Sequence, residues 1–369
     1  MNIITRQIVK KYVDERLVSE TKHPELDLWI YNYTPKCQYD QKWDDVTMMC
    51  RGLIFDKNGN VVARPFKKFF NIEEKHDDIP SENFKVYEKY DGSLGILYFC
   101  DDSNVAGDDS NVAGDDIINN SNVVVDDVIN NSNVVVATRG SFTSEQAIKG
   151  TKILREKYKD YVFDRRYTYL FEIIYPENKI VVDYHSTEDL ILLAIIDTKT
   201  GMDIPMTSEH FKHFNVVRLY DGINDITQLR EGDDNGANRE GYVILFESGL
   251  RIKLKFSEYV RLHKIVTELT EKRIWEHLKN KESISELLEH VPDEFYKWVI
   301  NMLKKYNTGY SRIENDVKSE FKTIKHIKDR KSYAKEALKS KYKTILFKMY
   351  DKNPYYDEHI WKMLEPKNR

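Results

Sequence analysis

The hydrophobic pattern of the chain changes near residue 257, and this change limits the folds that are open to it. Between residues 26 and 256 the apolar residues fall into short runs of strand type, among them LDLWIYNY, RGLIFD, YTYLFEIIY and LRIKLKF. After residue 257 they recur at helical spacing almost without interruption. We therefore predict an α+β protein in which a sheet-rich domain of residues 1–256 precedes an all-α domain of residues 257–369.

Some element boundaries follow from the same patterns. The runs VVARPFKKFF and KIVVDY predict two of the strands, and the segment SEQAIKGTKILREKYKDY predicts an amphipathic helix capped by Ser144. In the all-α domain, DEFYKWVINMLKKYN and IENDVKSEFKTIKHI are interpreted as two successive helices.

Residues 101–136 form a low-complexity insert of four units, each of which opens with Asp-Asp. Two units read DDSNVAG, and the next two read DDIINNSNVVV and DDVINNSNVVV. Units of this size and number are too short and too few for a stacked-repeat fold. We expect an expanded hairpin loop without a catalytic role, either disordered or extending its flanking strands as a ribbon.

The charge is distributed unevenly along the 369 residues. The net charge is −4, but the residues from 251 onward hold 28 Lys and Arg against 18 Asp and Glu, so the preceding part is strongly acidic. A basic C-terminal part suits a polyanion such as RNA, and a lysine-rich solvated helical surface explains it equally well.

Composition excludes several classes of protein. The sequence contains no apolar run of membrane-spanning length and no signal peptide, so we expect a cytoplasmic or nuclear protein that does not bind membranes. Its three cysteines (Cys37, Cys50 and Cys100) are widely spaced and indicate neither a disulfide framework nor a zinc site.

The stretch EKYDGSLG places Lys89 two residues before Asp91-Gly92, between two runs of strand type. Asp-Gly is a strong hairpin signal, so an ordinary turn between paired strands explains it. The tetrapeptide Lys-x-Asp-Gly alone is therefore weak evidence for chemistry.

Other strands present charged residues on one face. Lys253 and Lys255 are two residues apart and point to the same side of LRIKLKF. By the same spacing Glu240 shares a face with Tyr242, and Lys68 shares one with Phe70. Glu172 is the single acid in the apolar run LFEIIY. Each case alone is explained by the outer face of a half-solvated sheet.

Taken in order, Cys50-Arg51-Gly52, RPFKKFFN, KYDGSLG, TRGSFTSEQA, LFEIIYPENKIVVDY, EGYVILF and KLK resemble the motif series of covalent nucleotidyltransferases. The series is most similar to that of the phage-type RNA ligase 1 family, and the resemblance extends into the helical region at DRKSYAKEA. It implies a nucleotidyltransferase domain built on antiparallel sheets and an ATP-dependent RNA ligase that works through a lysyl-AMP intermediate.

The resemblance also implies the role of each residue. Lys89 is the nucleophile, Lys253 and Lys255 contact the phosphates, and Glu172 and Glu240 serve catalysis and hold the metal, Mg²⁺ or Mn²⁺. Since a lysine amine is almost fully protonated at neutral pH, nearby cations and the metal are expected to favour its neutral form. The remaining predicted site residues are Asp91 in later steps, the stacking ring Phe70, and the nucleotide contacts Tyr31, Arg51, Lys68, Gly92, Arg139 and Tyr259.

The predicted substrate is RNA with a 3′-hydroxyl and a 5′-phosphate, with nicked tRNA as a hypothesis. An end-healing polynucleotide kinase/phosphatase is the expected functional partner, and the protein is expected to be a monomer. Lysines of the helical domain should contact RNA phosphates, and Tyr306, Tyr310 and Tyr333 should stack on bases. The alternatives are a DNA ligase, an mRNA-capping guanylyltransferase, and a non-catalytic RNA-binding relative.

Overall fold

The computed structural model describes residues 4–74, 79–100, 133–231, 238–267, 269–289, 291, 293–353 and 356–366. The chain divides into two compact units, Met1–His263 and Lys264–Arg369. The division lies after residue 256 because the start of α6 (Ser257–Val266) packs Tyr259 into the core of the first unit. Most of the predicted insert, up to residue 132, lies outside the described residues.

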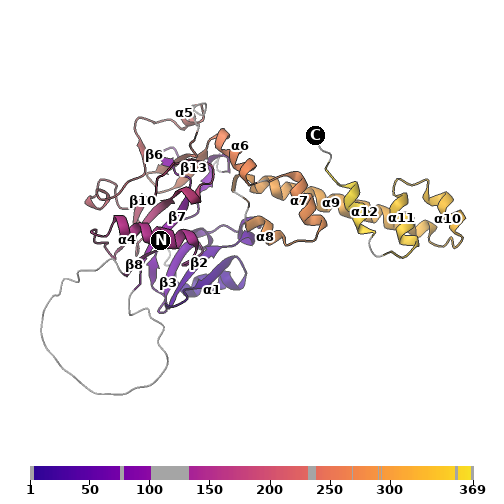
Figure 1. The fold of residues 1–369 in the computed structure, drawn as a ribbon, viewed down its shortest axis with the longest axis horizontal. Coiled ribbons are helices and arrows are strands. Elements are labelled where there is room, and N and C mark those ends of the chain that lie inside the picture. The colour runs from indigo at the N-terminus through magenta and orange to yellow at the C-terminus, as the bar shows by residue number, and fades with distance from the viewer. Residues whose placement is uncertain are drawn as a thin grey trace, which may run out of the picture. The chain divides into compact units, whose positions relative to one another are not determined.

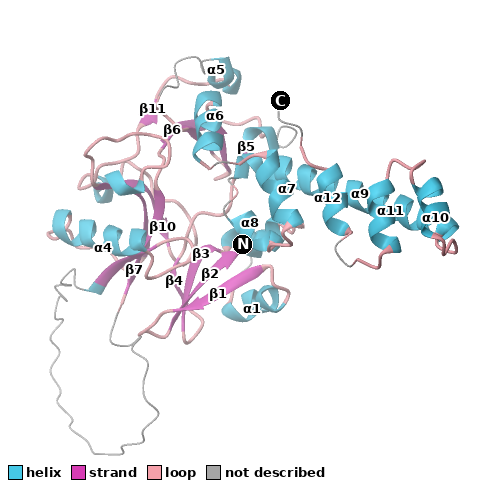
Figure 2. Ribbon diagram, turned by 45° about the vertical axis from the view of Figure 1, so that its right-hand side comes forward, coloured by secondary structure: helices cyan, strands magenta, loops and turns pink. Residues whose placement is uncertain are grey.

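Three sheets build the first unit (Figures 1 and 2), and almost all of their strand pairs are antiparallel. The first sheet has the order β1 (Val18–Lys22), β2 (Leu28–Tyr33), β3 (Arg51–Asp56) and β4 (Val61–Ala63). The second has the order β10 (Asp189–Asp197), β9 (Tyr167–Ile174), β7 (Ser93–Phe99) and β8 (Val134–Ala137). The third has the order β11 (Leu219–Tyr220), β6 (Phe84–Lys89), β12 (Gly241–Phe246), β13 (Arg251–Lys255) and β5 (Phe70–Asn71).

The second sheet is covered on both faces, which explains why its strands are almost continuously apolar. One face packs Phe171 and Ile173 against Ile153 and Leu154 of α4 (Glu145–Lys157). The other face packs against apolar residues of the first sheet. Ser144 caps α4 by accepting a hydrogen bond from the Ala147 amide, as predicted.

Shorter helices complete the first unit. They are α1 (Arg6–Asp14), α2 (Pro35–Tyr39), α3 (Asp45–Met49) and α5 (Ile226–Glu231), with 3-10 turns at Ile72–Glu74, Pro176–Asn178 and Glu209–Phe211.

The second unit is helical. Its helices are α7 (Glu271–Lys279), α8 (Ile284–Glu289), α9 (Asp293–Ile324), α10 (Arg330–Ala337), α11 (Lys343–Tyr350) and α12 (Asp357–Met363). One hydrophobic cluster joins α9 to α10, α11 and α12. No helix in the described part of the chain has both the length and the apolar character to cross a bilayer.

Several sequence predictions were wrong. The alternative of an ordinary hairpin turn at Asp91-Gly92 is excluded, because β6 belongs to the third sheet and β7 to the second. The two helices predicted at residues 293–327 are one helix of 32 residues, α9, up to Ile324. Residues 179–184 form no strand, and the run from Val61 to Phe70 is strand only at its two ends. At the end of the insert, Val134–Val136 pair with β7, which agrees with the expectation that the insert extends its flanking strands.

The expected stacking tyrosines of the helical unit are largely internal. Tyr306 and Tyr333 are buried, and their hydroxyls donate hydrogen bonds to Glu271 (2.8 Å) and to the Leu346 carbonyl (2.7 Å). Tyr310 is half-buried against Trp361. The prediction that Tyr306 and Tyr333 stack on bases is therefore wrong, because a buried ring with a satisfied hydroxyl serves the core.

Candidate active site

Three neighbouring strands place two of the predicted lysines in one row. Lys89 of β6 lies opposite Gly241 of β12, which lies opposite Lys255 of β13. Lys253 lies two residues before Lys255 and so projects from the same face of the sheet. The alternate residues of β13 pack into the core on the other face, as predicted: Ile252, Leu254 and Phe256.

Glu240 joins both lysines of this row. Lys89 Nζ donates to Glu240 Oε2 at 2.6 Å, and Lys255 Nζ lies 3.0 Å from Glu240 Oε1. The Glu240 side chain is 3% exposed, against 21% for Lys89 and 10% for Lys255. Burial alone would raise the pKa of Glu240, but the two ammonium groups hold it below its ordinary value. The carboxylate is therefore ionised and shared.

Gly241 makes this sharing possible. Its φ of +152° is a conformation that side chains rarely adopt, and a Cβ atom there would lie 2.0 Å from the Leu254 carbonyl oxygen. The prediction that Glu240 and Tyr242 share a face was wrong, because this backbone conformation interrupts the strand alternation. Glu240 reaches the lysines, whereas Tyr242 packs against Phe256 in the core.

The bend after Lys89 brings in the second predicted acid. The Gly92 amide donates to Glu172 Oε1 at 2.9 Å, and a Cβ atom at Gly92 would lie 2.7 Å from the Ile173 carbonyl oxygen. Burial raises the pKa of Glu172 to about 7, while the Lys89 charge lowers it and the Glu240 charge raises it. Glu172 can thus take up or release a proton near neutral pH.

Asp91 holds the bend through its hydrogen bonds. Its Oδ2 accepts hydrogen bonds from the Val181 and Val182 amides, both at 2.8 Å, and its Oδ1 accepts one from the Tyr259 hydroxyl at 2.7 Å. Tyr184 accepts the Asp91 amide at 2.8 Å. Asp91 and Tyr259 are both buried, and the Tyr259 hydroxyl is bonded to Asp91.

Strand β5 connects the lysine row to the predicted nucleotide contacts. It runs parallel to β13, with Phe70 opposite Ile252 and Asn71 opposite Lys253. Asn71 is buried, and its Oδ1 has no hydrogen-bond partner among the described residues. A buried acceptor of this kind requires an explanation, and a bound ligand or ordered water supplies one.

Lys68 lies in a cage of aromatic rings. Its ammonium is 4.9 Å from the ring centroid of Trp43, 5.0 Å from that of Phe70 and 5.3 Å from that of Tyr33. A second cation also contacts Tyr33, since Arg139 Nη1 donates a hydrogen bond to the Tyr33 hydroxyl at 3.2 Å. The structure thus brings together Lys68, Phe70 and Arg139 as predicted.

Arg51 approaches the same region along β3. It lies opposite Asn32, and its guanidinium carbon is 5.6 Å from the Phe69 ring. Gly52, at φ +106°, is so close to the segment of Arg139 that a Cβ atom would lie 3.4 Å from the Arg139 Cα. The first sheet therefore contributes Arg51 to this region, close to the segment after β8 of the second sheet that carries Arg139.

The comparison with known families is decisive at this point. The sequence profile described as RNA ligase matches residues 49–260, which is more than half of the chain and includes nearly all of the residues above. The chain belongs to the RNA ligase family. The predicted phage-type RNA ligase 1 family and the predicted enzyme class are confirmed.

Two relatives in sequence agree with this family assignment. The ligase is 23% identical over 361 residues to the RNA ligase of Rhodothermus phage RM378, covering 81% of this chain and 76% of the relative. It is 27% identical over 275 residues to a protein of Autographa californica nuclear polyhedrosis virus named "Putative bifunctional polynucleotide kinase/RNA ligase", covering 69% of this chain and 36% of that protein. A solved archaeal ATP-dependent RNA ligase has a TM-score of 0.44 and 13% identity, covering 78% of this chain and 69% of that one.

Tyr31 does not join the other predicted residues of the ligase. Its ring is buried in the cluster under α1, and its hydroxyl accepts a hydrogen bond from Arg6 Nε at 2.9 Å and donates one to Glu20. Tyr33, two residues further along the same strand face, lies beside Lys68 instead. The prediction of Tyr31 as a nucleotide contact was therefore wrong, because α1 covers that part of β2.

Sequence reasoning missed Tyr33 and Trp43. Tyr33 is detectable from strand alternation, since it occupies the same face as Tyr31. Trp43 lies between α2 and α3, where no periodic pattern marks it.

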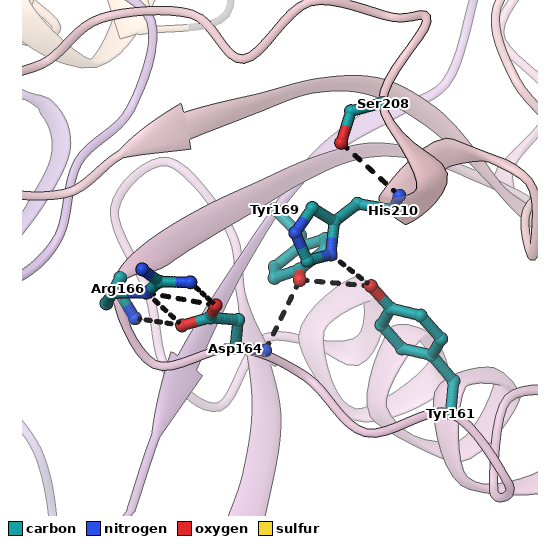
Figure 3. Close-up of polar contacts among 6 residues, drawn as sticks. All are labelled: Tyr161, Asp164, Arg166, Tyr169, Ser208 and His210. Carbon is teal, nitrogen blue, oxygen red and sulfur yellow. Dashed lines mark hydrogen bonds and ion pairs between the residues drawn. The ribbon is translucent and has the colours of Figure 1, made fainter.

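A second polar cluster of the ligase is structural. Figure 3 shows the Tyr161 hydroxyl between the Tyr169 hydroxyl (3.2 Å) and His210 Nδ1 (3.1 Å). The Asp164 amide donates to the Tyr169 hydroxyl at 3.3 Å, and the Arg166 guanidinium keeps the pKa of Asp164 below its usual range. The cluster connects the segment before β9 to the 3-10 turn at Glu209–Phe211 and contains none of the predicted site residues.

Proposed function

We propose that this RNA ligase is ATP-dependent and that Lys89 is the residue that carries AMP. The observation that supports this best is the shared carboxylate: Glu240 holds Lys89 and Lys255 in one row, with Glu172 beside them. A module that only binds RNA has no need for a buried carboxylate between two lysines next to a second acid.

The proposed reaction has three balanced steps. The Lys89 amine, after losing a proton, forms a bond to the α-phosphorus of ATP, and the bond to the β-phosphate oxygen breaks to release pyrophosphate. The oxygen of an RNA 5′-phosphate then displaces Lys89, which takes back a proton, and gives an adenylylated RNA end. Finally the RNA 3′-hydroxyl attacks the 5′-phosphorus, loses its proton, and releases AMP.

The residues around Lys89 fit these steps. Glu240, at 2.6 Å, holds the Lys89 ammonium in place, whereas Glu172, whose pKa is raised to about 7 by burial, can take up a proton near neutral pH. Lys253 and Lys255 present positive charge on the same face, where it stabilises the phosphate oxygens as charge develops. Gly92 allows the bend after Lys89 to lie close against β9, where its amide holds Glu172.

Glu172 and Glu240 are the residues that would hold Mg²⁺ or Mn²⁺. Their hard oxygen donors fit such an ion, and the described residues contain no group of three or more His, Cys, Asp or Glu side chains that would instead form an all-protein site. When bound together with ATP, the ion would neutralise phosphate charge.

Phe70, Arg51, Lys68 and Arg139 would line the nucleotide pocket. Phe70 is partly exposed and offers a ring for stacking, and the three cations suit the phosphates. Arg139 presents a planar fork rather than the point charge of a lysine, so its contacts to phosphate would be directional.

The helical unit would bind the RNA backbone, because its basic residues are exposed. They include Lys304, Lys322, Lys325, Lys328 and Lys331. Nicked tRNA is the proposed substrate. A kinase/phosphatase that prepares the ends is the proposed partner, as the name of the baculovirus relative combines kinase with ligase.

The first test is mass spectrometry of the protein after incubation with Mg²⁺ and ATP. The wild type should gain one adenylate, and Lys89→Arg, which retains the positive charge beside Glu240, should gain none. Labelling by GTP in place of ATP would indicate a capping-type enzyme, and no covalent nucleotide at all would contradict the proposal.

The second test concerns RNA. Triple replacement of Lys322, Lys325 and Lys328 by Glu should weaken binding of nicked tRNA by about 10-fold or more, because fewer counterions are released. A matched variant with Lys11, Lys57 and Lys152 replaced by Glu has the same change of net charge. If both triple variants bind alike, the helical unit is not the RNA-binding part.

A further inference from the structure

Trp43 is the ring that connects the cage around Lys68. It packs edge-to-face on Tyr33, with centroids 5.1 Å apart, and on Phe70, with centroids 5.8 Å apart. Its own centroid is the one nearest to the Lys68 ammonium, at 4.9 Å. Tyr33 and Phe70 come from different sheets, so Trp43 bridges the two walls of the cage.

The buried position of the Trp43 indole is unfavourable for its N–H group. Its Nε1 atom is buried and has no hydrogen-bond partner among the described residues. A buried indole N–H normally finds an acceptor, and leaving it without one is unfavourable. The contacts that the ring itself makes are therefore the evident reason for its position.

The backbone couples Trp43 to Lys68. Trp43 immediately precedes Asp44, which caps α3 through hydrogen bonds from the Val46 and Thr47 amides. At the other end of α3, the Lys68 amide donates to the Met48 carbonyl at 2.7 Å. One short helix thus fixes the position of the ring relative to the lysine.

Lys68 is 8% exposed, which is unusual for a lysine. An ammonium over aromatic faces is attracted by their negative quadrupole, and the attraction grows when water is excluded. Three rings at about the same distance restrict where the ammonium can lie. A cation fixed in this way needs no reordering when an anionic ligand arrives.

We propose that Trp43 is a positioning residue for nucleotide binding, which acts by holding the Lys68 ammonium in the orientation that ATP requires. This rests on the proposed function, in which Lys68 lines the ATP pocket. Trp43 itself carries no proton or phosphoryl group in the reaction.

The test measures the dissociation constant of ATP with Mg²⁺ by calorimetry, using the full chain with Lys89→Arg so that no ATP is consumed. Trp43→Leu removes the aromatic face and should raise the dissociation constant by roughly 3- to 30-fold, the range of a cation–π contact. Trp43→Phe keeps a face over Lys68 and should restore most of the affinity.

A double-mutant cycle separates positioning from general packing. In a Lys68→Met background, adding Trp43→Leu should change ATP affinity by less than about 2-fold, because the ammonium that the ring positions is gone. Trp29→Leu is the matched control: Trp29 lies under Arg6, at 3.6 Å from its guanidinium carbon, and should leave ATP affinity unchanged.

The outcomes distinguish a positioning role of Trp43 from a general packing role. Equal losses for Trp43→Leu and Trp43→Phe, or an undiminished loss in the Lys68→Met background, would overturn the proposal, as would a protein that does not bind ATP. If ATP binds and the cycle behaves as expected, but the protein with Lys89 gains no adenylate, the inference stands and the proposed function fails.

Discussion

Lys89 Nζ and Glu240 Oε2 lie 2.6 Å apart, so the nucleophile of the proposed reaction is ion-paired with a buried carboxylate that Lys255 also contacts. We predict that Glu240→Gln lowers the free energy of unfolding by about 2–3 kcal/mol, since it leaves two neighbouring ammonium groups without their shared counter-charge. The same variant should form no detectable lysyl-AMP. Urea unfolding and the mass assay measure the two effects.

Glu88→Gln is the control for this prediction. Glu88 pairs with Arg239 at 3.4 Å, and both side chains are more exposed than Glu240. Its replacement should cost less than about 1 kcal/mol. Equal losses of stability in Glu240→Gln and Glu88→Gln would show that the carboxylate shared by two lysines stabilises the fold no more than an ordinary surface ion pair does.

Glu172 should make the stability of the ligand-free protein fall as pH rises. Burial raises its pKa in the folded state to about 7, above an unfolded value of about 4.3. The folded state therefore binds the Glu172 proton more tightly than the unfolded state does. This difference contributes its full amount to the free energy of unfolding below pH 4.3, and the contribution is lost as the pH rises toward 7. The slope is at most about 1.4 kcal/mol per pH unit.

Glu172→Gln isolates this effect, because its amide oxygen can still accept the Gly92 amide and has no charge at any pH. The variant and the wild type should be similarly stable near pH 4.5. At pH 8 the variant should be the more stable of the two by urea unfolding. A difference between the two proteins that does not change with pH would contradict the raised pKa.

Strand alternation was sufficient to predict which face of β13 carries the two lysines. Lys253 and Lys255 project from one side and the apolar residues from the other, because a two-residue period survives in any regular strand. Glu172 was detectable for a related reason, as a single acid in an apolar strand. Local pattern and resemblance therefore singled out most of the acids and lysines that the structure brings together.

What the sequence did not reveal depends on long-range packing. The pattern of β2 gives Tyr31 and Tyr33 the same face, and only the position of α1 decides that Tyr31 is internal. Asp91-Gly92 has the composition of a hairpin turn, but the chain passes there from one sheet to another. Trp43 belongs to a loop whose only local signal is the helix cap that follows it.

The hydrogen bonds of Asp91 predict a structural role. Asp91→Ala would leave two backbone amides and the Tyr259 hydroxyl without an acceptor and should cost about 3–5 kcal/mol. Asp91→Asn can still accept from both amides, while Tyr259 reverses its hydroxyl to accept from the new amide, so it should cost about 1–2 kcal/mol.

The activity of Asp91→Asn separates structure from chemistry. If Asp91 only holds the bend, this variant should still form lysyl-AMP at a rate within about 10-fold of the wild type, or about 1.4 kcal/mol in activation free energy. Tyr259→Phe, which removes one hydrogen bond, should cost about 1 kcal/mol and serve as the reference. A loss of adenylylation far beyond 10-fold in a folded Asp91→Asn protein would assign Asp91 to the reaction itself.

Gly241→Ala should be among the most damaging single substitutions in the third sheet. Its φ of +152° disfavours any side chain, at about 1–2 kcal/mol, and the new Cβ atom would lie 2.0 Å from the Leu254 carbonyl oxygen, so β12 and β13 must separate. We expect a loss of about 3–5 kcal/mol in urea unfolding, since the clash adds to the strain. Gly222→Ala is the matched control, because Gly222 has a φ of +81° but no atom within 4 Å of the added Cβ. Gly222→Ala should therefore lower the free energy of unfolding only by the cost of the unfavourable φ. A similar loss in both variants would mean that the clash between residue 241 and the Leu254 carbonyl oxygen relaxes without cost.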